Sequence, residues 1–295
     1  MSRRSLPTGM ATLSLIPSAI LILVAYVGTM LWTVNISFTA SRSLPVADYV
    51  GFGNYVRLFG SARWQTSLEH MAIFGVLFIA GCLTLGFLLA VFLDQKIRGE
   101  DGWRTIFLYP YAMSFIVTGL IWQWMMNPAL GIQKTMRDLG WESFTFDWTA
   151  NRDMAIYAVV IAALWQSSGL VMALMLAGLR GIDEEIWKAV KVDGIPVWRA
   201  YVSIILPMLA PMIGTAVVLL SISTVKVYDL VVALTNGGPG SASEVPAKFV
   251  MDYLFQRANI GLATSASVIM LLIVLAVLGP FFYFKTYGAR RRTAA

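Results

Sequence analysis

The sequence predicts an all-α integral membrane protein with six transmembrane helices. Hydrophobic residues make up 58% of the 295 residues, charged residues only 13%, and mean hydropathy is +0.72. Soluble domains carry about 25% charged residues, so this composition excludes a soluble globular protein. The single cysteine, Cys82, lies in an apolar run, and the lone His70 starts another without a nearby ligand set. We therefore expect neither a disulfide nor a metal site, and a structural role for His70.

Apolar runs long enough to cross a bilayer core of about 30 Å recur along the chain. The six predicted spans cover residues 12–38, 68–93, 105–126, 154–179, 204–235 and 261–284. The first follows Arg3 and Arg4 as a signal peptide would. Its apolar run is longer than the roughly 7–15 residues of a secretory h-region, so we expect it to be retained. Pro17 can kink this span, and Pro207 and Pro211 can break the fifth.

The segments between the spans carry turn and interface signals. Residues 127–153 form a polar loop in which Trp141 and Trp148 suit a membrane interface. The run Asn-Gly-Gly-Pro-Gly at 236–240 predicts a turn. Residues 249–255 predict a short surface helix after that turn.

The basic residues predict the orientation of the chain. Six spans place both termini on one side of the membrane, and by the predicted boundaries that side carries 13 Lys and Arg residues against 8 on the other. Because an excess of Lys and Arg marks the cytoplasm, we expect both termini and residues 180–199 to be cytoplasmic. The net charge of +6 is spread over many loops, which membrane orientation explains better than nucleic-acid binding.

The chain is organised around residues 183–207, DEEIWKAVKVDGIPVWRAYVSIILP. Asp183 can cap a helix whose first turn holds two glutamates, which the helix dipole favours. Gly194 is placed as a left-handed stop, and Pro196 can open a second helix at its first position. The rows of the largely apolar face are Trp187, Val190 and Gly194, and Ile186, Ala189 and Asp193.

Physics alone leaves two interpretations of this first helix. Its apolar face can dock in a groove of a soluble partner, or the helix can lie on lipid headgroups through Lys188 and Lys191. The segment resembles the cytoplasmic coupling loop, the EAA loop, of permease subunits from bacterial ABC importers, which favours docking. The family pattern is Glu-Ala-Ala, three residues, Gly, nine residues, Ile-x-Leu-Pro. The matching places hold Lys188-Ala189-Val190, Gly194 and Ile204-Ile205-Leu206-Pro207.

Two positions of this loop depart from the family pattern. Lys188 replaces the family glutamate and Val190 the second alanine, so an ion pair made by that glutamate cannot be carried over. Glu184 or Glu185 could hold Lys188 within the helix instead, at about 0.2–0.5 kcal/mol per pair. The resemblance implies coupling to an ATPase through Glu184, Glu185, Trp187, Lys188, Ala189, Val190, Asp193, Gly194 and Pro207.

The resemblance extends over nearly the whole chain after the first span. Residues 51–59, GFGNYVRLF, resemble a G-x-x-N-Y stretch of the sugar-importer branch, and Tyr109-Pro110-Tyr111 resembles the family's L-P-Y turn. The segments WQSSGL and LTNGGPGSASEVPAKFVMDYLF are most similar to those of permeases for glucose, mannose or alpha-glucosides. The resemblance implies the type I ABC importer permease fold, with residues 1–295 as a single permease domain.

No nucleotide-binding or catalytic motif is visible in the chain. A GxxxxGK[ST] loop and a nucleophile elbow are both missing from the sequence. The resemblance implies that the chain is not an enzyme, that it binds no cofactor, and that ATP and Mg²⁺ bind two separate ATPase subunits. It also implies a heterodimeric pore with a second permease subunit and an extracytoplasmic sugar-binding protein, at the bacterial inner membrane.

Polar side chains in two spans predict a path for a sugar. Gln166 and Ser167 interrupt the fourth span at mid-membrane depth. In the fifth span, Ser221, Thr224 and Tyr228 are spaced as one face of a helix. Neutral hydrogen-bonding groups and aromatic faces suit sugar hydroxyls, although hydrogen bonds between helices are the alternative role. The predicted path comprises Trp165, Gln166, Ser167, Ser221, Thr224, Tyr228 and Asp229.

Lys226 and Asp229 leave a second function open. A charge at the bilayer centre costs about 2.5–3.5 kcal/mol on insertion scales, so the two should face the bundle interior, pair, or lie near the outer interface. As a proton relay they would make the chain a self-sufficient proton-coupled secondary transporter. Against this, the chain is short, has no visible inverted repeat, and carries a docking loop that such a carrier does not need. A membrane enzyme would need a nucleophile–base pair or a metal set, and the sequence has neither.

Restoring the family acid with Lys188→Glu tests whether this departure is compensated. The substitution would add a third acid to a turn that already holds Glu184 and Glu185, and like charges at i, i+4 destabilise a helix by a few tenths of a kcal/mol. We expect unchanged or slightly weaker ATPase docking in a pull-down assay. A large gain in coupled transport would show instead that the partner needs an acid here.

Overall fold

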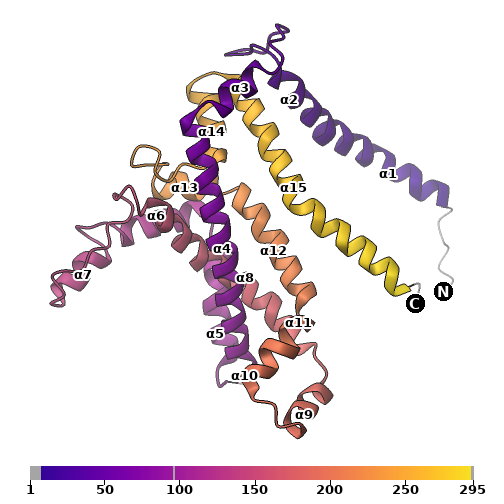
Figure 1. Ribbon diagram of the computed structural model, residues 1–295, viewed down its shortest axis with the longest axis vertical. Coiled ribbons are helices and arrows are strands. Elements are labelled where there is room, and N and C mark those ends of the chain that lie inside the picture. The colour runs from indigo at the N-terminus through magenta and orange to yellow at the C-terminus, as the bar shows by residue number, and fades with distance from the viewer. Residues whose placement is uncertain (1–7, 96, 294–295) are drawn as a thin grey trace. The chain divides into compact units, whose positions relative to one another are not determined.

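A computed structural model describes residues 8–95 and 97–293 (Figure 1). The described secondary structure is helical, apart from one isolated antiparallel bridge between Thr39 and Tyr49. Three of the basic residues on the predicted cytoplasmic side lie outside the described residues, namely Arg3, Arg4 and Lys96.

The helices gather into two compact units. One comprises Met1–Ser61 and Val250–Leu271, and the other Ala62–Phe249 and Leu272–Ala295. In the first unit the helices are α1 (Thr8–Ile22), the π-helical η1 (Leu23–Gly28), α2 (Thr29–Ser37), α3 (Gly53–Phe59), the π-helical η4 (Asp252–Gln256) and the first part of α15 (Ile260–Thr293).

The second unit holds most of the chain. Its helices are α4 (Ala62–Asp94), α5 (Glu100–Leu108), the 3-10 helix η2 (Tyr109–Ala112), α6 (Phe115–Met125), α7 (Ile132–Asp138), α8 (Ala155–Arg180), α9 (Glu184–Val192), α10 (Val197–Ala200), the π-helical η3 (Tyr201–Ile205), α11 (Leu206–Met208), α12 (Ala210–Val225) and α13 (Tyr228–Leu234). Helix α14 (Pro246–Met251) begins in this unit and ends in the other.

Four described helices are long and apolar enough to cross a membrane. They are Leu15–Ser37, Ala62–Asp94, Ala155–Arg180 and Ile260–Gly279. These four helices agree with the predicted first, second, fourth and sixth spans. The helix of the first span continues through Pro17 and turns π-helical only after Ile22.

The third and fifth spans are bent. Helices α5 and η2 meet α6 at 101°, beside Pro110. The helices from Val197 to Met208 meet α12 at 70°, between the predicted breaking points Pro207 and Pro211. Each bent pair taken together is long and apolar enough to be one span, which gives up to six crossings in the described residues.

The first unit shows what the asparagine of GFGNY does. Asn54 begins the buried side of α3, and its Nδ2 donates to the backbone oxygens of Ser37 at 2.9 Å and Thr39 at 2.8 Å. Ser37 is the last residue of α2 and Thr39 lies two residues further on, where a helix leaves its last oxygens without intrahelical partners. Gly261 passes so close that an added Cβ would lie 2.6 Å from the oxygen of Thr39. Asn54 therefore closes the end of α2 and ties α3 to it.

The second unit is built around the packing of α4 on α8. Small residues permit this approach: a Cβ on Gly86 would lie 2.6 Å from Val171 Cβ and 2.9 Å from Met172 N. Phe78 and Met172 are fully buried in the same cluster. Small residues at such crossings are typical of membrane helices, where contact between backbones replaces the hydrophobic effect.

The segment predicted as a surface helix over residues 249–255 is different in the structure. Helix α14 starts earlier, at Pro246, and Phe249 is fully buried, with its ring 5.1 Å from that of Trp64. Phe249 of this segment therefore belongs to the core. Its burial depends on Trp64 at the start of α4, which lies far away in the sequence.

Gly86→Ala should weaken the second unit, since a methyl group placed 2.6 Å from Val171 forces α4 and α8 apart. We expect a loss of about 1–3 kcal/mol, as for other overpacked cores, measured as a lower thermal midpoint in detergent. Gly102→Ala is the matched control, because nothing lies within 4 Å of a Cβ there. Equal midpoints for the two variants would contradict the close approach.

Candidate functional site

The segment after α8 folds as two short helices around a glycine turn. Helix α9 begins after Asp183, whose backbone oxygen accepts from Ile186 N at 3.1 Å. The Asp183 side chain makes no capping hydrogen bond, so only its predicted position is confirmed. Pro196 is the N-cap residue of α10, one place before the predicted first helical position.

Gly194 supplies the left-handed turn between these helices. Its φ is +64°, and Ile195 N donates to the oxygen of Val190 at 3.1 Å, which closes the end of α9. An added Cβ would meet nothing within 4 Å. The requirement for glycine is therefore conformational and does not come from crowding.

The apolar face of α9 packs against its own chain. The Trp187 ring lies 5.4 Å from the ring of Tyr201 in an edge-on arrangement, and Val190 is 6% exposed. Trp187 and Val190 thus anchor the helix. The other predicted coupling residues, Glu184, Glu185, Lys188, Ala189, Asp193, Gly194 and Pro207, are exposed.

The outward face of α9 is charged as a result. Lys188 Nζ lies 3.9 Å from Glu184 Oε2, so the predicted i, i+4 contact is present on the helix. Both side chains are exposed, and such a pair contributes little to stability. This face, carried on a fixed turn at one end of the second unit, can contact a partner protein (Figure 1).

Gln166 has a role that the sequence did not reveal. It is 2% exposed, and its Nε2 donates to the oxygen of Met113 at 2.7 Å. Met113 lies at the bend between η2 and α6, where the helical hydrogen-bond ladder is interrupted. Gln166 thus satisfies a carbonyl that the bend leaves free.

Gly169 completes the support of this bend. It lies three residues after Gln166 on α8, and a Cβ there would come within 2.1 Å of the oxygen of Phe107. The backbone of α5 can therefore touch α8 only because position 169 has no side chain. A glycine inside a predicted span was the available sign of such a close approach.

The remaining polar groups of α8 and α6 face different surroundings. Ser167 is 4% exposed and Trp165 is 37% exposed. The Trp165 ring lies 6.1 Å from the Trp122 ring. Trp122 Nε1, Thr118 Oγ1 and Gln166 Oε1 are buried without a hydrogen-bond partner among the described residues. These three atoms retain hydrogen-bonding capacity inside the unit.

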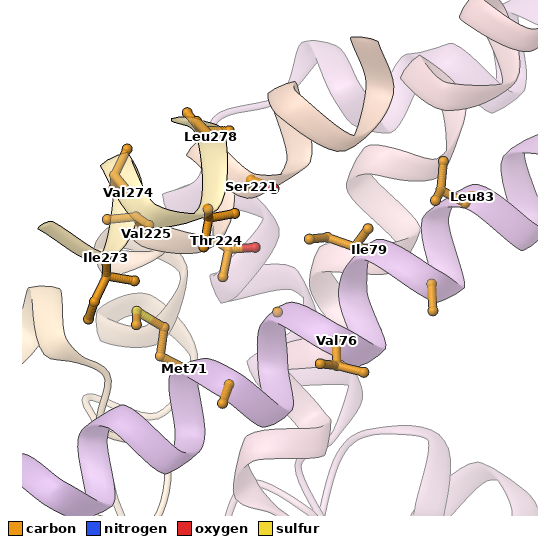
Figure 2. A pocket seen from close by; sticks show the side chains of 14 residues that line it. Met71, Val76, Ile79, Leu83, Ser221, Thr224, Val225, Ile273, Val274 and Leu278 are labelled. Atoms are coloured by element: carbon orange, nitrogen blue, oxygen red, sulfur yellow. The ribbon is translucent and has the colours of Figure 1, made fainter. Parts of the chain in front are cut away.

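Ser221 and Thr224 line a cavity of about 550 Å³ between α4, α12 and the second part of α15 (Figure 2). The rest of the lining is apolar, with Met71, Ile79 and Ile273 on the walls. Thr224 Oγ1 donates to the oxygen of Leu220 at 3.0 Å within its own helix. Ser221 Oγ has no hydrogen-bond partner among the described residues. The cavity therefore offers one unoccupied hydroxyl.

Tyr228 does not share a helix face with Ser221 and Thr224, which corrects the predicted i, i+3, i+7 spacing. Helix α12 ends at Val225, and Tyr228 begins α13 after a break at Lys226 and Val227. The path residues therefore divide into Ser221 and Thr224 at the cavity, and others outside its lining. Those outside it are Trp165, Gln166, Ser167, Tyr228 and Asp229.

Lys226 and Asp229 lie beside this break and not in the middle of a helix. Both are exposed on this chain, and no ion pair joins them among the described residues. The part of the chain that the structure describes also holds no group of three His, Cys, Asp or Glu side chains suited to a metal ion. Nothing in this geometry favours a proton-relay carrier.

The sequence profile described as "Binding-protein-dependent transport system inner membrane component" matches residues 83–292. The chain belongs to this family. Such a transport component is a multi-pass protein of the inner membrane, which agrees with the four to six candidate spans.

Several relatives of this transport component cover most of the chain. It is 35% identical to a probable ABC transporter permease protein of Pyrococcus horikoshii, over 98% of this chain and 100% of the relative. It is 30% identical to a xylose/arabinose import permease protein of Haloferax volcanii, over 92% and 86%. It is 32% identical to an sn-glycerol-3-phosphate transport system permease protein of Rhizobium meliloti, over 78% of each chain.

Solved structures agree with the predicted importer permease fold. A crystal structure of a bacterial ABC transporter involved in the import of the acidic polysaccharide alginate superposes with a TM-score of 0.80 at 18% identity, covering 96% of this chain and 95% of that chain. The same transporter in complex with an alginate pentasaccharide-bound periplasmic protein also gives 0.80 at 18%, covering 93% of each.

Gln166→Leu tests the support at the bend. It leaves the half-buried oxygen of Met113 without its hydrogen bond, which costs up to about 1–3 kcal/mol. We expect a lower thermal midpoint and less assembled protein. Tyr228→Phe is the matched control, because it also deletes one polar group, at the start of α13, and the Tyr228 hydroxyl makes no hydrogen bond within the described residues. If both variants kept wild-type stability, Gln166 would not brace the bend.

Proposed function

We propose that this chain is one of two pore-forming subunits of an ATP-driven importer of a carbohydrate. The observation that carries this proposal is helix α9, which presents an exposed charged face beside the Gly194 turn. An outward face on a helix fixed by its own Trp187 and Val190 suits docking to a separate ATPase. ATP and Mg²⁺ would then bind that partner, and α9 with both termini would be cytoplasmic.

The substrate class is proposed from the relatives. Their names include xylose/arabinose, sn-glycerol-3-phosphate and trehalose/maltose, and the alginate importer takes a polysaccharide. Each of these substrates is a sugar, a polymer of sugar units or a sugar-alcohol phosphate, and carries at least two hydroxyl groups. A polyhydroxylated substrate such as a mono- or disaccharide is the proposal for this chain, delivered by an extracytoplasmic binding protein, as in the alginate complex.

The route through the membrane would be shared with the second permease subunit. Among the described residues that line the cavity, only Ser221 and Thr224 are polar, and the Thr224 hydroxyl already bonds to its own helix. A sugar needs many more hydrogen-bonding partners. We therefore propose that Ser221 and Thr224 form one wall of the route, with Trp165, Gln166 Oε1, Ser167, Tyr228 and Asp229 contributing in other conformations, and that the partner supplies the rest.

Reconstitution of the chain with its second permease, ATPase subunits and binding protein in proteoliposomes tests this function. We expect ATP-dependent uptake of a sugar, and co-purification of the ATPase in mild detergent. Uptake by this chain alone, driven by a proton gradient, would overturn the proposal in favour of a secondary carrier.

Gly194→Val should uncouple that complex. A β-branched residue at a φ of +64° costs about 1–2 kcal/mol or more, so α9 can no longer hold its orientation. We expect normal membrane insertion, with ATP-driven uptake lost. Gly194→Asn is the matched control, since asparagine tolerates the left-handed region, and should keep most of the uptake. Wild-type uptake by a well-expressed Gly194→Val complex would remove the turn from the coupling step.

A further inference from the structure

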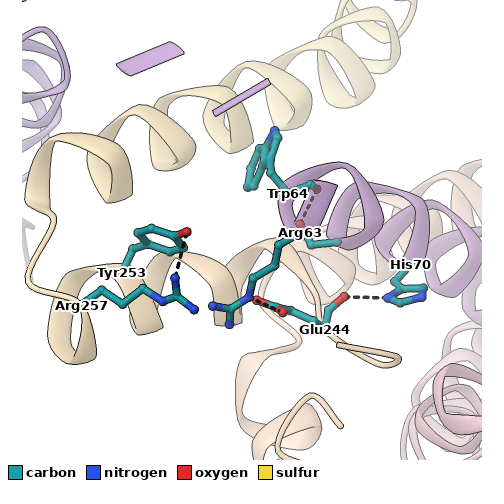
Figure 3. Close-up of polar contacts among 7 residues, drawn as sticks. Arg63, Trp64, His70, Glu244, Tyr253 and Arg257 are labelled. Carbon is teal, nitrogen blue, oxygen red and sulfur yellow. Dashed lines mark hydrogen bonds and ion pairs between the residues drawn. The ribbon is translucent and has the colours of Figure 1, made fainter. Parts of the chain in front are cut away.

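A buried acid joins two distant parts of the second unit. Glu244 lies in the loop between α13 and α14 and is 2% exposed. Its Oε2 accepts a hydrogen bond from Arg63 Nε at 2.7 Å, and its backbone oxygen lies 3.0 Å from His70 Nδ1 (Figure 3). Arg63 and His70 both belong to the first turns of α4. Two contacts thus hold this loop to the start of α4.

The loop is held together by its own hydrogen bonds. Thr235 Oγ1 and Ser243 Oγ lie 2.7 Å apart, and Ser243 Oγ donates to the oxygen of Gly238 at 2.9 Å. Asn236 and Gly237 both adopt positive φ, at 51° and 81°. The contact between Ser243 and Thr235 connects the neighbour of Glu244 to the end of α13. A movement of Glu244 would therefore also move the end of α13.

Helix α13 is in turn clasped to α6. A Cβ on Gly119 would lie 2.6 Å from Ala233 Cβ and 3.2 Å from the oxygen of Leu230, so the two backbones nearly touch. The start of α4, the loop, α13 and α6 therefore form one continuous series of contacts. This series ends far from α9, which lies at the opposite end of the second unit (Figure 1).

The ion pair is poorly suited to a purely stabilising role. A buried charge is expensive to desolvate, and apolar residues of similar volume are often as stabilising or more so. Glu244 Oε1 is buried without a hydrogen-bond partner among the described residues. A carboxylate that uses only one oxygen is released more readily than one that uses both, which suits a contact that must be broken and remade.

We infer that Glu244 and Arg63 are positioning residues for transport: their ion pair makes α4, α13 and α6 move together. This inference rests on the proposed function, because it assigns the pair to the transport cycle. A change that starts at the α9 end and moves α4 together with α8 would reach α13 and α6 through Arg63 and Glu244. Without the pair, ATP hydrolysis would continue but would move these helices less efficiently.

The amount of sugar taken up per ATP hydrolysed tests this inference in the reconstituted complex. Glu244→Gln keeps the volume and removes the charge, and we expect that ratio to fall severalfold. Asp138→Asn makes the same chemical change in the exposed Lys134–Asp138 pair of α7 and should leave it unchanged. A merely structural role would lower uptake and hydrolysis in proportion to the surviving complex, and the ratio would stay constant.

Arg63→Met approaches the pair from the other side. We expect a fall in the ratio, and a double variant no worse than Arg63→Met alone, because that substitution removes the ion pair together with the contact between the Arg63 guanidinium and the Phe249 ring. If Arg63→Met does not assemble, Arg63→Lys retains the charge and should give an intermediate ratio. A wild-type ratio in Glu244→Gln and in either Arg63 variant would overturn the inference alone. Absence of ATP-dependent uptake by the wild-type complex would overturn the proposed function and this inference together.

Discussion

The close packing of α4 against α8 is the constraint on which the rest of the second unit depends. Both helices are long enough to span a membrane. At Gly86 they lie so close that an added Cβ would be 2.6 Å from Val171 Cβ. The bend of the third span and helix α9 are both attached to this pair. Gln166 and Gly169 on α8 hold the bend of the third span, and α9 follows the end of α8.

The bend of the third span depends on the same pair of helices. A helix interrupted inside a membrane exposes carbonyls that lipid cannot satisfy, so a bend is stable only where a neighbouring helix supplies a donor. α8 supplies one through Gln166 to Met113. The polar residue in the fourth span is therefore needed for the shape of the third, whatever further role its Oε1 plays.

Much of the fold could be predicted from local sequence. Hydropathy located the spans, and the spacing of Gly194 and Pro196 predicted the turn after α9, because glycine freedom and proline geometry act within a few residues. The bend at Met113, the break before Tyr228 and the burial of Phe249 could not be predicted, since each depends on a residue from another helix or on the packed unit. Arg63 and Glu244 are 181 residues apart, and no local pattern marks such a pair. The partner and path roles of individual side chains depend on chains outside this one.

Helix α9 packs on Tyr201 with one face and leaves the opposite face exposed for the proposed docking. Trp187 and Val190 keep the helix in place, so the residues of the opposite face are not needed for the packing of α9. Position 188 lies on this exposed face, so it can hold a lysine without affecting the packing of α9. If α9 docks on an ATPase as proposed, replacing the exposed charged residues of this face could direct the permease to the ATPase of another importer and leave its own fold unchanged.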